Sequence, residues 1–252
     1  MITETLYEDD NHKFLYFGKD IDRPEYIIDT NQYLIVHDKV GCVLDPGGIE
    51  IFSAVSSSLA GEIRMSDVKY FFCSHQDPDV NSSLALWVSI TEAKVIIDRI
   101  WSTFITHYGV QPSNMTMIED NGMKFNMTKD YSFEIIPAHY LHSPGNLNLY
   151  DPISKILFTG DIGAGLMPKE DLKTKKGRNI FVNNFNDHIK YMEWFHKRFM
   201  GSMEAKKAWI ERVSKLDIET IAPQHGLIFK GKDMVNNFLN WFDSLKVGLY
   251  SK

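Results

Sequence analysis

Ser74-His75-Gln76-Asp77-Pro78-Asp79-Val80 places one histidine and two carboxylates at alternate positions, directly after an apolar segment. In an extended loop, residues i, i+2 and i+4 point the same way. His75, Asp77 and Asp79 can therefore converge on one site. Asp and Pro are also ordinary turn residues, so a polar turn after a strand explains this stretch equally well when it is taken alone.

The segments around this stretch alternate between apolar strands and amphipathic helices. Residues 70–73 predict a buried strand, residues 81–93 a helix and residues 94–97 the next strand. Shorter apolar runs predict strands at residues 14–17, 33–36, 42–44, 133–137, 147–150 and 156–158. A helix is expected from residue 49, and the last third of the chain is mostly helical and closes with a helix over residues 234–247. This order predicts an α+β fold in which helices cover sheets.

Three further ligand-type residues stand where an apolar strand enters a loop that contains Gly or Pro: His142, Asp161 and His225. Strand ends hold functional side chains rigidly. Together with the first stretch they give three imidazoles and three carboxylates, which is too many for one structural zinc ion. The set suits two metal ions that share a bridging carboxylate. Iron, zinc and manganese all accept such mixed nitrogen and oxygen ligands, so these residues leave the metal open.

Composition narrows the class of protein. The chain has 252 residues, of which 44% are hydrophobic, and this length fits one large domain or two small ones. A net charge of −6 argues against nucleic acid or an anionic membrane as a partner. Only Cys42 and Cys73 occur, both in apolar runs, and no segment reaches the roughly 20 apolar residues of a membrane span. We therefore expect a cytoplasmic protein.

The ordered set His75-x-Asp77-x-Asp79, His142, Asp161 and His225 resembles the metallo-β-lactamase fold over nearly the whole chain. Hydrolases of that superfamily have H-x-H-x-D-H, whereas the carboxylate of Asp77 is similar to the H-x-E-x-D pattern of flavodiiron proteins. Residues 157–161 and 222–226 also resemble flavodiiron segments. They resemble more closely those of oxygen-binding diiron proteins, which lack a flavodoxin domain. The resemblance implies one metallo-β-lactamase-like domain over residues 1–252, an αββα sandwich with mixed sheets and helices on the outer faces.

The resemblance also implies a role for each candidate ligand. His75, Asp77 and His142 would bind one iron, Asp79 and His225 the other, and Asp161 would bridge the pair. Asp77 departs from the family pattern because it replaces the longer Glu.

Two positions need a choice. Val80 stands where a further His commonly occurs, which should leave the second iron an open position beside an apolar side chain. His139 and His142 share one loop, and Ser143-Pro144 after His142 favours His142 as the ligand.

The implied function is binding of O2 as a diferric peroxo adduct, for oxygen sensing or signalling, with two Fe ions and no FMN in this chain. The alternatives are an O2 or NO reductase that needs an external electron donor and a dinuclear zinc hydrolase. A signalling partner and a homodimer are expected from the resemblance.

The remaining candidate residues receive structural interpretations. Asp45 should shape a turn, and His196 should be buried or interfacial. The other assignments are surface positions for His12, His37, His107 and His188, and a solvated loop for Lys173, Lys175 and Lys176.

Overall fold

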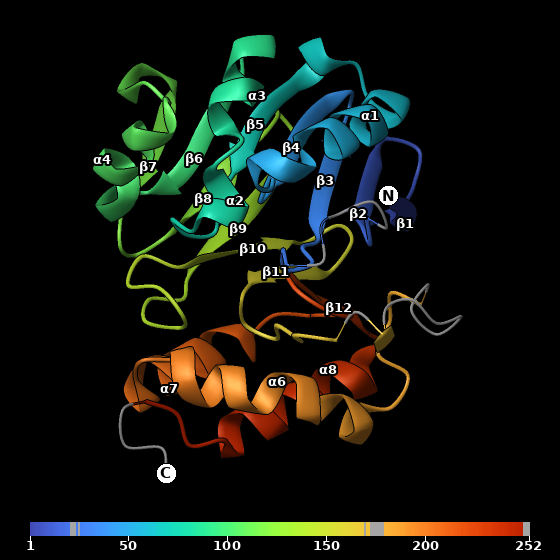
Figure 1. Ribbon diagram of the computed structural model, residues 1–252, viewed down its shortest axis with the longest axis vertical. Coiled ribbons are helices and arrows are strands. Elements are labelled where there is room, and N and C mark those ends of the chain that lie inside the picture. The colour runs from blue at the N-terminus through green and yellow to red at the C-terminus, as the bar shows by residue number, and fades with distance from the viewer. Residues whose placement is uncertain (21–23, 25, 169, 172–178, 249–252) are drawn as a thin grey trace.

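In the computed structural model, two β-sheets pack face to face, and helices cover the outer face of each sheet (Figure 1). The structure describes residues 1–20, 24, 26–168, 170–171 and 179–248. The lysines of the predicted solvated loop, Lys173, Lys175 and Lys176, lie outside these ranges. The layers confirm the predicted α+β sandwich.

The first sheet holds seven strands in the order of the sequence. They are β1 (Ile2–Glu8), β2 (His12–Gly18), β3 (Gln32–His37), β4 (Val40–Leu44), β5 (Val68–Phe72), β6 (Lys94–Asp98) and β7 (Met115–Ile118). The strands from β1 to β4 pair antiparallel, and those from β4 to β7 pair parallel. Parallel neighbours need crossover connections. The helices of these connections are α1 (Phe52–Glu62), α2 (Pro78–Asn81), α3 (Leu84–Ile90) and α4 (Ser102–Ile105).

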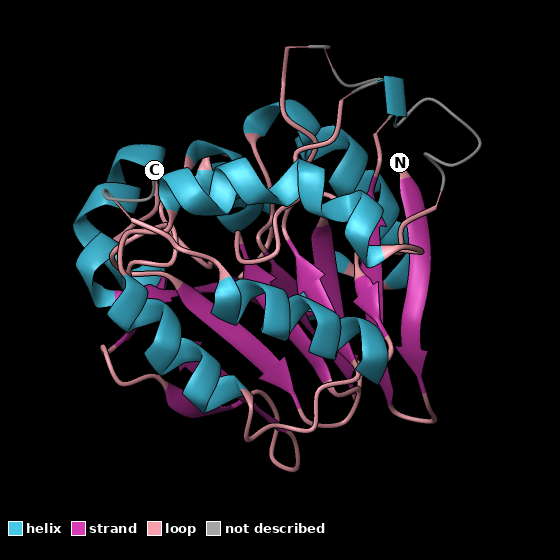
Figure 2. Ribbon diagram, turned by 90° about the horizontal axis from the view of Figure 1, so that it is seen from below, coloured by secondary structure: helices cyan, strands magenta, loops and turns pink. Residues whose placement is uncertain are grey.

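The second sheet has the order β13-β12-β11-β10-β9-β8. Its strands are β8 (Met123–Asn126), β9 (Ser132–Pro137), β10 (Leu147–Asp151), β11 (Ile156–Gly160), β12 (Thr220–Pro223) and β13 (Phe229–Lys230). Only β11 and β12 pair parallel among these described strands. The helices α6 (Phe185–Phe199), α7 (Met203–Val213) and α8 (Lys232–Ser244) lie over this sheet (Figure 2).

Aromatic side chains fill the space between the two sheets. Phe158 of the second sheet meets Tyr33 and Phe72 of the first in edge-to-face pairs, with ring centroids 5.5 and 6.1 Å apart. All three side chains are fully buried and belong to one core cluster. Such pairs add to the free energy of burial, so this layer holds the two sheets in register.

Two predicted helices differ from the structure. The helix expected over residues 81–93 is shorter in the structure, where α3 covers Leu84–Ile90 and α2 ends at Asn81. The Ser83 hydroxyl, between the two helices, donates to the carbonyl of Gly47. The last helix was expected to reach Val247 but ends at Ser244. There the buried ammonium of Lys206 donates to the carbonyls of Phe242, Asp243 and Leu245, which satisfies groups that a helix end leaves unpaired.

Within the described ranges, we find no helix with the length and apolar character that a membrane span requires.

Candidate metal centre

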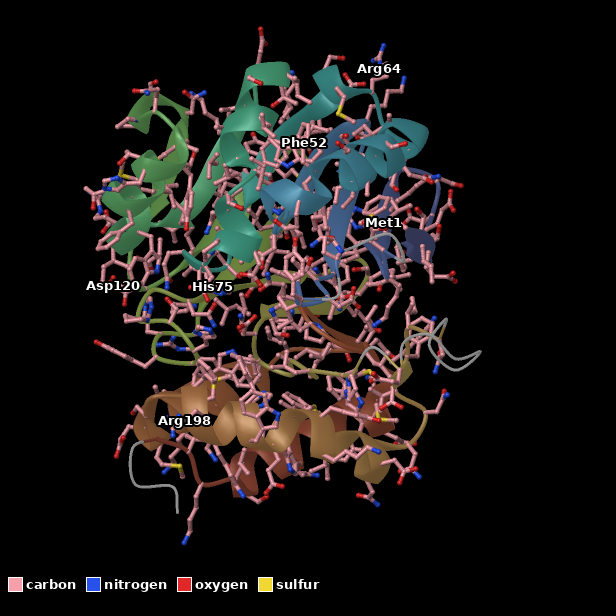
Figure 3. The ribbon with its side chains drawn as sticks, in the orientation of Figure 1. Met1, Phe52, Arg64, His75, Asp120 and Arg198 are labelled. Atoms are coloured by element: carbon pink, nitrogen blue, oxygen red, sulfur yellow. The ribbon has the colours of Figure 1, made fainter. Side chains whose placement is uncertain are left out.

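Five of the six predicted ligands lie in loops at the ends of strands in both sheets, and Asp79 lies in the first turn of α2. His75, Asp77 and Asp79 follow β5, and Asp77 is the N-terminal cap residue of α2 with Pro78 in its first turn. The other three lie between β9 and β10 (His142), directly after β11 (Asp161) and two residues after β12 (His225). In the view of Figure 3, His75 lies between α2 and α6, the helix that carries Arg198.

One half of the cluster is formed by His75, Asp77 and His142. The Oδ2 atom of Asp77 lies 3.5 Å from His75 Nε2 and 3.4 Å from His142 Nε2. One ligand atom from each of these residues falls within 4.8 Å of the others. The Nε2 atom of His75 is buried and has no hydrogen-bond partner among the described residues.

The other half is formed by Asp79 and His225, and Asp161 joins the halves. His225 Nε2 lies 3.3 Å from Asp79 Oδ2 and 3.4 Å from Asp161 Oδ1. The second oxygen of Asp161, Oδ2, lies 3.3 Å from His142 Nε2. Each oxygen of Asp161 therefore faces a histidine of a different half, which is the arrangement of a bridging carboxylate.

The donor set fits divalent metal ions. With bonds of about 2.0–2.2 Å, two ligand atoms on one ion are separated by roughly 3.0–3.6 Å at octahedral to tetrahedral angles. The nitrogen–oxygen distances in both halves fall in this range. Imidazole and carboxylate donors without thiolate suit iron, zinc or manganese. Coordination by these six residues stays a prediction.

A buried relay orients His75. The Asp45 carboxylate accepts hydrogen bonds from the Ser74 amide at 2.7 Å and from the Ser74 hydroxyl at 2.6 Å. The Ser74 oxygen lies 2.8 Å from His75 Nδ1 and, since its own proton points to Asp45, it accepts from that nitrogen. The proton on Nδ1 leaves Nε2 for the site, as is usual for histidines that bind metal.

His225 is oriented by the backbone. Its Nδ1 donates to the carbonyl of Asp29 at 2.7 Å, which again turns Nε2 toward the carboxylates. The side-chain amide of Gln224 lies 3.4 Å from Asp79 Oδ2. His196, predicted to be buried or interfacial, is fully buried and its Nε2 accepts from the amide of Gly163, two residues after Asp161.

The structure distinguishes His142 from His139. The backbone of His142 has a φ of 76°, a left-handed conformation that is uncommon outside Gly and typical of functional sites. Its ring packs against Phe195 and Phe199, with centroids 5.7 and 5.5 Å away. His139 instead uses Nε2 to bond the carbonyl of Asp120 at 2.8 Å. Only His142 of this pair contacts the cluster.

The carboxylates stabilise positive charge at the site. Burial by itself lowers the pKa of His225, but Asp161 and Asp79 outweigh it and raise that pKa to about 10. For His75 burial is likewise outweighed, by Asp161 and Asp77, and its pKa rises to about 9. The pKa of His142 is lowered, because burial dominates there. A cation, whether a proton or a metal ion, is therefore favoured among these side chains.

Sequence reasoning missed several residues that support the ligands. Ser74 and Gln76 were given no role. The side-chain amide of Gln76 donates to Asp77 Oδ1 at 2.8 Å, and its side-chain carbonyl accepts from the Ser143 hydroxyl at 2.6 Å. Asn81 donates to the carbonyl of His75 at 2.6 Å. In the sequence, these residues are marked only by their polar side chains, a hydroxyl in Ser74 and amides in Gln76 and Asn81.

Three histidine predictions were wrong. His12, His37 and His188, assigned to the surface, are all buried, whereas His107 is exposed as expected. His12 and His37 pair through their Nδ1 atoms, and His12 also pairs with Asp151 of the other sheet, so His12 has a partner for each ring nitrogen in the interior. Asp45, by contrast, shapes a buried turn with a φ of 46°, in agreement with its predicted structural role.

Comparison with known proteins places this chain in a family. Residues 28–226 match the family described as ODP family beta lactamase. The chain belongs to this family. A chemotaxis sensor ODP, solved as a peroxy diiron species, is 41% identical to this ODP-family chain with a TM-score of 0.86, over 98% of this chain and 97% of the other. The apo state of chemotaxis sensor ODP from T. denticola, also 41% identical, has a TM-score of 0.85 and aligns over 98% and 96% of the two chains.

More distant relatives are longer proteins. An uncharacterized protein of Methanocaldococcus jannaschii is 26% identical over 84% of this chain, and a diflavin flavoprotein of Synechocystis is 25% identical over 85%. The ODP-family chain spans 52% and 36% of their respective lengths. A flavo di-iron protein variant from Thermotoga maritima, 21% identical over 96% of this chain and 60% of its own, shares the fold with a TM-score of 0.77.

Proposed function

We propose that this chain is a non-haem diiron protein that binds O2 and serves in oxygen sensing. The observation that carries the proposal is its 41% identity, over nearly the full length of both chains, with a chemotaxis sensor ODP solved as a peroxy diiron species. The cluster of three imidazoles and three carboxylates supports it, because two ions with a shared carboxylate need such a donor set.

The ligands divide into two groups. His75, Asp77 and His142 hold one iron, and Asp79 and His225 hold the other. Asp161, whose two oxygens face different halves of the cluster, would bridge the two ions. This division follows the nitrogen–oxygen distances of 3.3–3.5 Å, each of which joins atoms assigned to the same ion.

A reduced iron pair, when bound, supplies one electron from each ion to O2. The protein side chains prepare the site for this chemistry. The Asp45–Ser74 relay and the Asp29 carbonyl keep Nδ1 of His75 and His225 protonated, so that each Nε2 remains a ligand. Phe195 and Phe199 cover the ring of His142 with apolar surface, which limits the access of water to that side of the site.

Metal analysis combined with an anaerobic O2 titration tests the proposal. Protein purified without oxygen should contain about two irons per chain. Exposure of the reduced protein to O2 should produce a visible absorption band that persists. Two zinc ions with hydrolytic turnover would refute the iron proposal. Rapid catalytic consumption of O2 or NO with an external electron donor would instead support the reductase alternative.

Three expectations about the wider context remain part of the proposal. Residues 1–252 form a single domain, which the core shared by the two sheets supports. A second copy of this chain or a signalling partner binds near the site. The exposed side chains of Tyr140, Trp194 and Phe199 offer apolar surface there. A cytoplasmic location agrees with Cys42 and Cys73, which are both free and buried.

A further inference from the structure

A second group of possible metal ligands lies at the other end of the strands. His37 ends β3, and Asp38 begins the turn that leads into β4. Strand β4 runs from this turn toward Asp45, and β5, parallel to it, runs toward His75. Asp130 lies in the turn between β8 and β9 of the other sheet. The group therefore joins turns of both sheets on the side away from the iron ligands.

His37 points an unpartnered nitrogen at the two carboxylates. Its Nε2 atom lies 3.8 Å from Asp38 Oδ2 and 3.8 Å from Asp130 Oδ1, and one atom from each residue falls within 4.8 Å of the others. Its side chain is 4% exposed, and Nε2 has no hydrogen-bond partner among the described residues. A separation of 3.8 Å is too long for a hydrogen bond. It lies slightly above the roughly 3.0–3.6 Å that separates two ligands of one ion with bonds of about 2.0–2.2 Å, a difference that a small rotation of either exposed carboxylate removes.

With His12 in its neutral form, the hydrogen bonds behind His37 determine which nitrogen of His37 carries the proton. The Asp151 carboxylate accepts from the Tyr131 hydroxyl at 2.9 Å, from the Ile153 amide at 3.1 Å and from the Ser154 hydroxyl. It is thus held as an anion, and His12 Nε2 donates to it at 2.7 Å. In a neutral His12 the Nδ1 atom is then an acceptor. It lies 3.2 Å from His37 Nδ1, which must donate.

This order of protons leaves a lone pair on His37 Nε2. The lone pair faces the oxygens of Asp38 and Asp130, which are also acceptors. Asp130 Oδ1 accepts from the Thr128 hydroxyl at 2.8 Å, but that hydroxyl does not neutralise the carboxylate. The two carboxylates and the lone pair of His37 repel one another, and a cation between them would remove that repulsion. The ring of His37 cannot easily turn away, because it stacks on Tyr131 with centroids 4.7 Å apart and an angle of 24° between the planes.

The group is accessible from solvent. The carboxylates of Asp38 and Asp130 are 51% and 63% exposed. A cavity of about 500 Å³ has Asp38, His12 and Asp10 among its lining residues. The exposed carboxylates are open to an ion from solvent, and the buried nitrogen of His37 provides the fixed end of the site.

We propose that His37, Asp38 and Asp130 bind a divalent metal ion, best matched by Zn²⁺, that ties the β3–β4 turn to the β8–β9 turn. One imidazole and two carboxylates are ordinary zinc ligands, and water would complete a four-coordinate site. The ion would fasten the two sheets together at the end remote from the iron ligands.

Zinc binding to the iron-loaded protein tests this site. The informative variants are Asp38→Asn and Asp130→Asn, since both positions are exposed and tolerate the change without loss of the core. The matched control is Asp10→Asn, which removes one negative charge from the same cavity without removing a ligand. Equilibrium dialysis against micromolar Zn²⁺, followed by metal analysis, should show one more zinc in the wild type and the control than in either variant. Binding to the variants should be at least about tenfold weaker.

Thermal unfolding gives a second measurement that does not depend on iron chemistry. Zn²⁺ should raise the Tm of the wild type and of Asp10→Asn but not that of Asp38→Asn or Asp130→Asn. Any exchange of zinc for iron at the ligands His75 to His225 should be equal in the four proteins, so it does not affect the comparison among them. Equal zinc content and equal Tm shifts in all four proteins would overturn the proposal. That result is also expected if a proton on His37 Nε2, rather than a metal ion, satisfies the two carboxylates.

Discussion

Asp161 Oδ1 lies 3.4 Å from His225 Nε2, while the other oxygen of the same carboxylate faces the opposite half of the cluster. The oxygen that faces His225 is buried and has no hydrogen-bond donor among the described residues. A buried carboxylate oxygen without a donor lowers the stability of the folded protein, and a bound cation can offset this cost. This relationship makes Asp161 the residue on which both halves of the site depend.

Asp161→Ala is therefore expected to affect both metal ions. Metal analysis of the purified variant should give less than about one ion per chain, compared with about two in the wild type. Asp243→Ala is a suitable control, because that carboxylate is exposed and lies outside the cluster. Full metal retention in Asp161→Ala would refute its assignment as the bridge.

The ligand set could be predicted from the sequence because its residues stand at strand ends. Strands are recognisable as apolar runs, and polar residues that follow them are conspicuous. The prediction brought His142, Asp161 and His225 together with the first stretch, and the structure places them within reach of one another. The choice between His139 and His142 came from the family resemblance, because both occupy one loop.

The surroundings of the ligands could not be predicted in the same way. Asp45 and Ser74 are far apart in sequence, and their contact arises only when β4 and β5 pair in parallel. The burial of His12 has a similar cause. His12 was assigned to the surface, and its partner Asp151 becomes adjacent only when the two sheets pack. Interactions between sheets leave little trace in a local pattern.

Ser74→Ala tests the relay behind His75. The change leaves His75 Nδ1 without its acceptor. It also removes one of the two donors to Asp45, the Ser74 hydroxyl, whereas the Ser74 amide remains. We expect metal affinity to fall by about 10–100-fold, the usual cost of losing a partner that orients a ligand. Competition with a chelator measures it. Ser89→Ala, which removes an exposed hydroxyl bonded only to the carbonyl of Leu86, is the control and should bind metal as the wild type does.

Metal loading should release protons at neutral pH. Despite burial, nearby carboxylates raise the pKa of His75 to about 9 and that of His225 to about 10. At pH 7.5 both rings are therefore protonated in the metal-free protein, and each must lose its proton to become a ligand. We expect release of about two protons per chain and an affinity that weakens as the pH falls.

Calorimetry in two buffers of different ionisation enthalpy measures the number of protons released. His225→Gln should release about one proton fewer than the wild type, since it lacks one titrating ring. An identical heat of binding in both buffers would contradict the assignment of these two histidines as ligands.

Val80→His tests whether an apolar residue keeps a coordination position open. Val80 follows Asp79 on α2, is fully buried and packs in the cluster that contains Leu84 and Trp87. Valine has no ligand atom, so O2 should reach the second iron directly. Introduction of His should tighten that iron and slow O2 capture by about tenfold, which corresponds to about 1.4 kcal/mol on the barrier. Stopped-flow absorbance measures the rate, circular dichroism checks the fold, and Val80→Ile controls for a change of volume in the core. A folded Val80→His protein that captures O2 at the wild-type rate would show that the open position does not depend on valine.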